Sequence, residues 1–102
     1  MVAKFNEEIR SCAALSAQGK GDPGYFVWAA QALRMARNAL EADGPEVALS
    51  YLQGLEVGMR IGVYAGSEAS RAKARGFLYG LYEAKGLIER SQAPKGANLL
   101  YF

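Results

Sequence analysis

The chain has 102 residues, of which 51% are hydrophobic and 22% are charged. This size and composition suit one globular domain with a hydrophobic core, and they exclude a disordered tail or a fibrous protein. With one cysteine and no histidine, the chain cannot form an internal disulfide or a Cys–His catalytic pair.

The net charge of +2 is unevenly distributed. Residues 1–69 hold six Lys/Arg and eight Asp/Glu, whereas residues 70–102 hold six and two, so the basic excess lies in the last third. The uncharged runs are shorter than the roughly 20 apolar residues that cross a bilayer. The first residues mix charged with apolar side chains, which is not typical of a signal peptide. We therefore predict a cytoplasmic protein that does not enter the membrane.

Apolar residues recur at three- and four-residue steps over residues 3–18, which predicts an amphipathic helix. Cys12 lies in the apolar stripe and is interpreted as a small buried hydrophobe. Residues 19–24 match the pattern G-x-G-x-x-G. A dinucleotide-binding loop of that pattern follows a strand, whereas this segment follows a predicted helix, so we interpret it as a connector.

A second helix is predicted over residues 23–42, with Asp22 as its N-cap and Pro23 at its first position. The centre of its apolar face is a stripe of alanines, flanked by larger side chains. The stripe consists of Ala29, Ala32, Ala36 and Ala39. Gly44 and Pro45 predict a tight break, so the next helix should return antiparallel beside this one.

The third predicted helix, residues 45–65, contains a glycine at every fourth position: Gly54, Gly58, Gly62 and Gly66. These four glycines share a broad face with apolar residues, including Val47, Tyr51, Leu52, Leu55 and Met59. Small residues at this spacing allow close helix approach, which predicts a packing seam. The seam lies either against the alanine stripe or between two chains of a homodimer.

A rival interpretation concerns residues 55–64, where apolar residues alternate with others as in a half-buried strand. The residues before Gly54 are strongly helical, and no second strand is available to pair with this one. We favour the helix.

The fourth helix is predicted over residues 68–85, with Ser67 as its N-cap. Its predicted buried face contains Ala69, Phe77, Leu78, Leu81, Ala84 and Ile88, with Gly76 and Gly80 at the edge. Lys85, Gly86 and Leu87 have the pattern of a helix end. The remaining residues, 91–102, are predicted to form a short irregular tail that docks on the bundle or on a partner, because the chain ends in four apolar residues.

Basic residues open the fourth helix, and they are the candidate partner-binding site together with two tyrosines. The residues are Arg71, Lys73, Arg75, Tyr79 and Tyr82. Arginine beside tyrosine suits an acidic protein surface, and it also suits phosphates and stacked bases. A plain solvated face is the alternative without function.

Taken together, the patterns predict an all-α protein, a small four-helix bundle formed by residues 1–90 as one domain. No residue pattern indicates a catalytic, metal or cofactor site, so we expect a protein that is not an enzyme and has no cofactor. The favoured function is a protein–protein interaction domain of the adaptor or inhibitor type, acting as a homodimer. The alternative is a nucleic-acid-binding accessory protein that uses the basic start of the fourth helix. An origin in a phage, plasmid or gene cassette is an expectation by association only.

Overall fold

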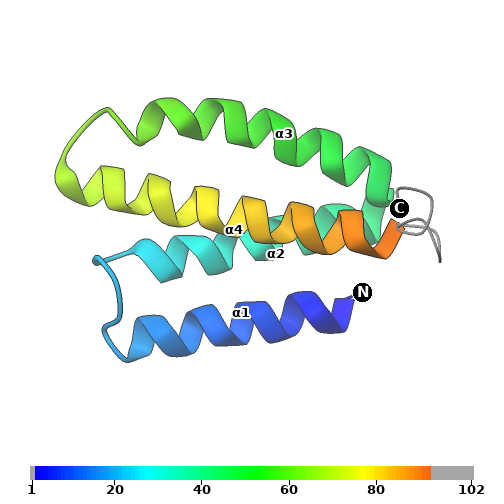
Figure 1. Ribbon diagram of the computed structural model, residues 1–102, viewed down its shortest axis with the longest axis horizontal. Helices are drawn as coiled ribbons and strands as arrows, with labels where there is room; N and C mark the ends of the chain where they lie inside the picture. The colour runs from blue at the N-terminus through cyan, green and yellow to red at the C-terminus, as the bar shows by residue number, and fades with distance from the viewer. Residues whose placement is uncertain (1, 93–102) are drawn as a thin grey trace, which may run out of the picture.

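A computed structural model describes residues 2–92 as four α-helices joined by short connections (Figure 1). They are α1 (Val2–Ala17), α2 (Tyr25–Asp43), α3 (Pro45–Gly62) and α4 (Glu68–Gln92). The predicted all-α class and the four helices are confirmed. The predicted C-terminal tail and its docking concern residues 93–102, which lie outside the described residues.

Two predicted helix starts have the expected chemistry, and one does not. Pro45 opens α3, and the Ser67 hydroxyl accepts a hydrogen bond from the Ser70 backbone N–H at the start of α4. The prediction that Asp22 caps a helix beginning at residue 23 is wrong. Gly24, with φ 87°, precedes α2 instead, and no side chain caps that helix. The left-handed conformation at this position favours glycine, and it leaves the Asp22 carboxylate free for another contact.

The end predicted near Gly86 is also wrong, because α4 continues to Gln92. Gly86 is not among the glycines with positive φ, and Ile88 beyond it is fully buried in the core. A glycine inside a helix costs about 1 kcal/mol relative to alanine. Burying an isoleucine side chain contributes about 1.5–3 kcal/mol, so packing outweighs the stop signal.

Residues 55–62 are helical, so the strand interpretation is wrong for them. α3 ends at Gly62, earlier than predicted, and the chain then turns through residues that include Gly66, with φ 84°. Gly66 is therefore a turn glycine and does not belong to the packing face of α3.

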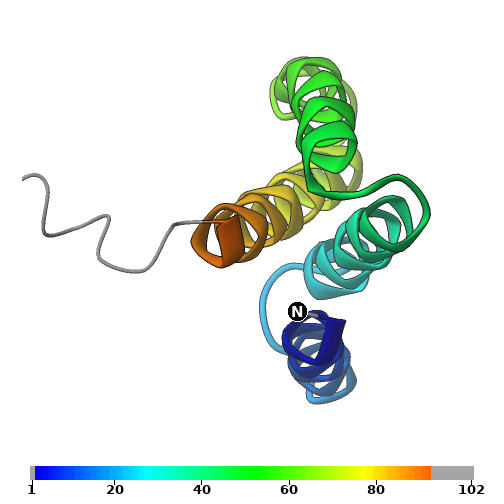
Figure 2. The ribbon, with the colours of Figure 1, turned by 90° about the vertical axis from the view of Figure 1, so that its right-hand side faces the viewer.

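Viewed end-on, α2 and α4 lie side by side in the middle, with α1 on one side of this pair and α3 on the other (Figure 2). α2 and α4 form the central pair, α1 packs mainly against α2, and α3 packs against α4 and α2. Within the described residues, α1 and α3 do not contact each other. The bundle is thus open, and each outer helix has one side without a neighbour among the described residues. Of the helices described, none is both long and apolar enough to cross a membrane.

Ala29 and Ala32 of the alanine stripe pack against Gly80 of α4, and no residue of the stripe lies within 4 Å of a Cβ added to Gly54, Gly58 or Gly62 of α3. A Cβ built on Gly76 would stand 2.8 Å from the Tyr25 Cα, and one on Gly80 would stand 2.8 Å from the Ala32 Cβ. No larger residue fits at either position without moving a helix, so glycine sets the α2–α4 spacing.

The core between the helices contains most of the apolar residues expected there. Its buried members include Phe5, Ile9, Cys12, Ala29, Leu33, Ala36, Leu52, Phe77, Leu78, Leu81, Ala84 and Ile88. Ala69 was predicted to be buried and is exposed in the first turn of α4. Val47 and Tyr51, which share the predicted packing face of α3, are 53% and 41% exposed.

Candidate functional site

α3 presents an exposed apolar side that no other described helix covers. We call this side the outer face of α3; it consists of Gly54, Val57, Gly58 and Ile61. Val47 and Tyr51 lie at its margin, where they line a groove together with Met35 and Ala39 of α2. Val57 is 62% exposed and Ile61 is 71% exposed. The inner side of the same helix, with Leu52 buried and Leu55 and Met59 half-buried, packs on the core. The outward side of a surface helix is usually polar, so exposed apolar residues of this size are unusual there.

The four glycines predicted to form one seam have three different roles. A Cβ added to Gly54 or Gly58 would meet no atom within 4 Å, whereas one on Gly62 would lie 3.2 Å from the Ala74 Cβ of α4. Gly66 lies in the turn. The prediction of a seam against the alanine stripe is therefore wrong, and the seam between two chains stays a prediction for Gly54 and Gly58. These two glycines together cost about 2 kcal/mol of helix propensity, although a Cβ at either position would find open space in the described part of the chain.

Polar side chains border the outer face along one edge. Arg60 donates a hydrogen bond to Glu56, with 2.9 Å between its Nη2 and the Glu56 Oε1. Contacts with the Tyr82 hydroxyl and the Glu56 carboxylate raise the pKa of Arg60. Tyr82 of α4 thus lies beside the polar edge of α3 and is 49% exposed.

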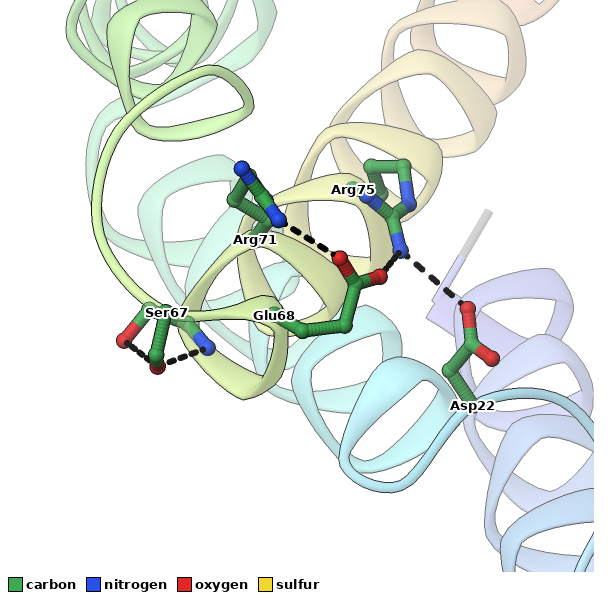
Figure 3. Close-up of polar contacts among 6 residues, drawn as sticks. Asp22, Ser67, Glu68, Arg71 and Arg75 are labelled. Atoms are coloured by element: carbon green, nitrogen blue, oxygen red, sulfur yellow. Dashed lines mark hydrogen bonds and ion pairs between the residues drawn. The ribbon is translucent and has the colours of Figure 1, made fainter.

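The basic start of α4 is largely neutralised by two carboxylates (Figure 3). Arg71 donates to Glu68 over 2.7 Å, and Arg75 donates to Glu68 over 3.3 Å and to Asp22 over 3.1 Å. Hydrogen bonds from Arg71 and then Arg75 lower the pKa of Glu68. Two cations therefore face two anions, and the cluster has little net charge.

Lys73 and Tyr79 do not join that cluster. The Lys73 side chain lies beside Gly24, on a different side of α4 from Arg71 and Arg75. Tyr79 is half-buried, and its ring lies 5.9 Å from that of Tyr25 between ring centroids. Burial raises the pKa of Tyr79. The predicted exposed side thus retains Arg71, Arg75 and Tyr82, while Tyr79 belongs to an aromatic cluster.

The remaining candidates for a chemical role are clusters of metal-ligating side chains and the thiol of Cys12. The described residues contain no group of three or more His, Cys, Asp or Glu side chains placed to hold a metal ion. Cys12 is buried, and this burial raises the pKa of its thiol, with Glu8 and Glu83 adding to the effect. A neutral buried thiol is a poor nucleophile.

No protein-family model, curated protein or solved structure matches the chain. The fold is an open all-α bundle. A proposal for its function has to be inferred from the surfaces of this protein alone. Sequence reasoning missed the exposure of Val57 and Ile61. A signal was present, because α3 has only three charged residues, Glu46, Glu56 and Arg60, among its 18. Such a helix offers apolar or small residues in more than one direction.

Proposed function

We propose that the chain is a protein–protein interaction domain of the adaptor or inhibitor type that forms a homodimer through the outer face of α3. The observation that supports this most directly is the pairing of exposed Val57 and Ile61 with the uncovered Gly54 and Gly58. Two copies of a patch that has apolar side chains next to glycines are complementary, because the side chains of each copy fit over the glycines of the other. A two-fold axis through such a patch places the same residues on both sides of one interface.

The glycines would let the two α3 helices approach below the usual 8–10 Å, with i±4 ridges interlocked. In that crossing, Val57 and Ile61 of one chain lie over Gly54 and Gly58 of the other. Full burial contributes about 1.5–3 kcal/mol for each exposed side chain of this size. This gain has to offset an association cost of about 4–15 kcal/mol.

The expected dimer is weak. α3 is 18 residues long, or about 27 Å at 1.5 Å per residue, and only one side of it takes part. Interfaces below about 1,200 Å² of total buried surface are generally transient. We therefore expect an exchange between one and two chains that depends on concentration.

A protein partner is favoured over nucleic acid for the exposed side of α4. Glu68 and Asp22 offset the charges of Arg71 and Arg75, whereas phosphate binding relies on cations free to displace counterions. Tyr82, which is half-exposed farther along α4 and interacts with Arg60 of α3, adds a residue type that is common at protein interfaces.

Two measurements on the intact chain test this proposal. Light scattering over a concentration series should show the mass rising from one chain toward two. Fluorescence anisotropy with labelled generic DNA and RNA, at low and moderate salt, should show no binding. A mass of one chain throughout would refute the homodimer, and salt-sensitive binding would favour the nucleic-acid role.

A further inference from the structure

An apolar groove lies between α2, α3 and α4, on the inner side of α3. Its volume is about 260 Å³. Phe77 and Ala74 of α4, 3% and 7% exposed, line it together with Met59 of α3. Trp28 of α2, 38% exposed, is a further lining residue, and its ring centroid lies 6.2 Å from that of Phe77. The groove therefore offers two aromatic rings and a flexible thioether to an apolar ligand.

A single cation accompanies this apolar lining. Lys73 of α4 is exposed, also lines the groove, and takes part in none of the ion pairs among the described residues. The nearby carboxylates of Glu68 and Asp22 are engaged by Arg71 and Arg75. An anionic group beside the groove could therefore pair with the Lys73 ammonium without competing with Glu68 or Asp22.

We propose that this groove binds an amphiphilic carboxylate, with its apolar chain against Trp28, Phe77 and Met59 and its carboxylate beside Lys73. Pockets for drug-sized ligands range over about 300–1,000 Å³, so a groove slightly below that range fits a medium-length chain. The charge of Lys73 argues for an anionic head group over a cationic one. The groove is separate from the outer face of α3, so the proposal does not depend on the homodimer.

The chain contains one tryptophan, and it lines the groove, which provides a direct readout. Decanoate, added below its micelle concentration, should move the Trp28 emission to shorter wavelength in a saturable titration. Octanoate should bind about tenfold more weakly, because two methylenes fewer leave less apolar surface to bury. Decyltrimethylammonium has a similar chain and the opposite charge, and it should bind less tightly than decanoate.

Variants separate the groove from unspecific binding to other apolar surface. Lys73→Glu should weaken decanoate binding about fivefold, because an exposed charge pair is worth up to about 1 kcal/mol. The matched control, Lys85→Glu, changes an exposed lysine of the same helix outside the groove and should leave the affinity unchanged. Ala65→Phe, which places a ring at an exposed lining position, should block binding while the melting temperature shows that the variant is folded.

The proposal fails if decanoate gives no saturable shift, if the cationic amphiphile binds as well, or if Lys73→Glu and Lys85→Glu behave alike. A Lys73-dependent shift with a short acidic, leucine-containing peptide, and none with decanoate, would also overturn it in favour of a protein ligand.

Discussion

Gly80 of α4 lies so close to Ala32 of α2 that a Cβ on the glycine would stand 2.8 Å from the alanine Cβ. Real Cβ atoms do not approach this closely, so the two central helices are held at a spacing that only glycine permits. This contact joins the two central helices, α2 and α4, so we expect the stability of the fold to depend on it.

The first prediction is that Gly80→Ala destabilises the protein by about 1–3 kcal/mol, the usual cost of overpacking a core. The loss occurs although alanine is the better helix former by about 1 kcal/mol. Urea unfolding followed by circular dichroism measures it. The matched control is Gly86→Ala on the same helix, where the added Cβ meets only the flexible end of Arg90 at 3.1 Å. That variant should be as stable as the wild type or slightly more stable, and equal losses in both would contradict the assignment.

The second prediction concerns Gly58, where an added Cβ meets nothing. At low protein concentration, Gly58→Ala should raise the free energy of unfolding by up to about 1 kcal/mol through helix propensity. At high concentration the same variant should dimerise less than the wild type, because the Cβ separates the two α3 helices. A destabilised monomer would mean that Gly58 packs within its own chain.

The third prediction is a pH dependence at Glu68. Hydrogen bonds from Arg71 and Arg75 hold the pKa of Glu68 below its ordinary value of 4.5, so they favour the folded state when the carboxylate is ionised. The wild type should be more stable than Glu68→Gln at neutral pH. The difference should be fully present above that ordinary value and disappear as the pH falls through the lowered one. Urea titrations at several pH values measure it.

The control for this dependence removes both donors. With Arg71 and Arg75 both changed to glutamine, Glu68→Gln should produce a clearly smaller pH-dependent difference in stability. The part that remains comes from the ionised carboxylate in the first turn of α4. A difference of unchanged size in that background would show that the arginines are not its cause.

The fourth prediction is that Cys12 reacts slowly with an aromatic disulfide reagent at neutral pH, because its thiol is buried and its pKa is raised. Urea should make the reaction fast. Ser11→Cys provides the comparison, since position 11 is exposed on the same helix and its thiol should react at once. Rapid labelling of native Cys12 would mean that α1 opens readily from the bundle.

Helical periodicity was sufficient to predict four helices, the hairpin at Gly44 and the Ser67 cap, because these depend on local spacing and capping chemistry. The alanine stripe of α2 was also recognised as a packing surface. Its partner was not, because a helical wheel shows which side is apolar and not which helix that side meets. Gly76 and Gly80, placed at an edge, are the residues that pack there.

The candidate site was harder to predict, because α3 is apolar in two directions and its inward side cannot be chosen from periodicity. Val57 and Ile61 proved to be exposed, on the same side as Gly54 and Gly58. At α4, the spacing that groups Arg71 with Arg75 was informative, but the neutralising contact of Arg75 with Asp22 joins residues 53 positions apart. Such long-range pairings are set by tertiary packing and have no local signal.

The central claim is that two chains associate through the outer face of α3, and sedimentation equilibrium of a matched pair of variants tests it most directly. Ile61→Lys puts a charge on that face, and Gln53→Lys puts the same charge on an exposed position of the same helix outside it. We predict that the wild type and Gln53→Lys move from one chain to two as concentration rises, while Ile61→Lys stays at one chain and remains folded. Equal association of all three proteins, or none in any, would contradict the claim.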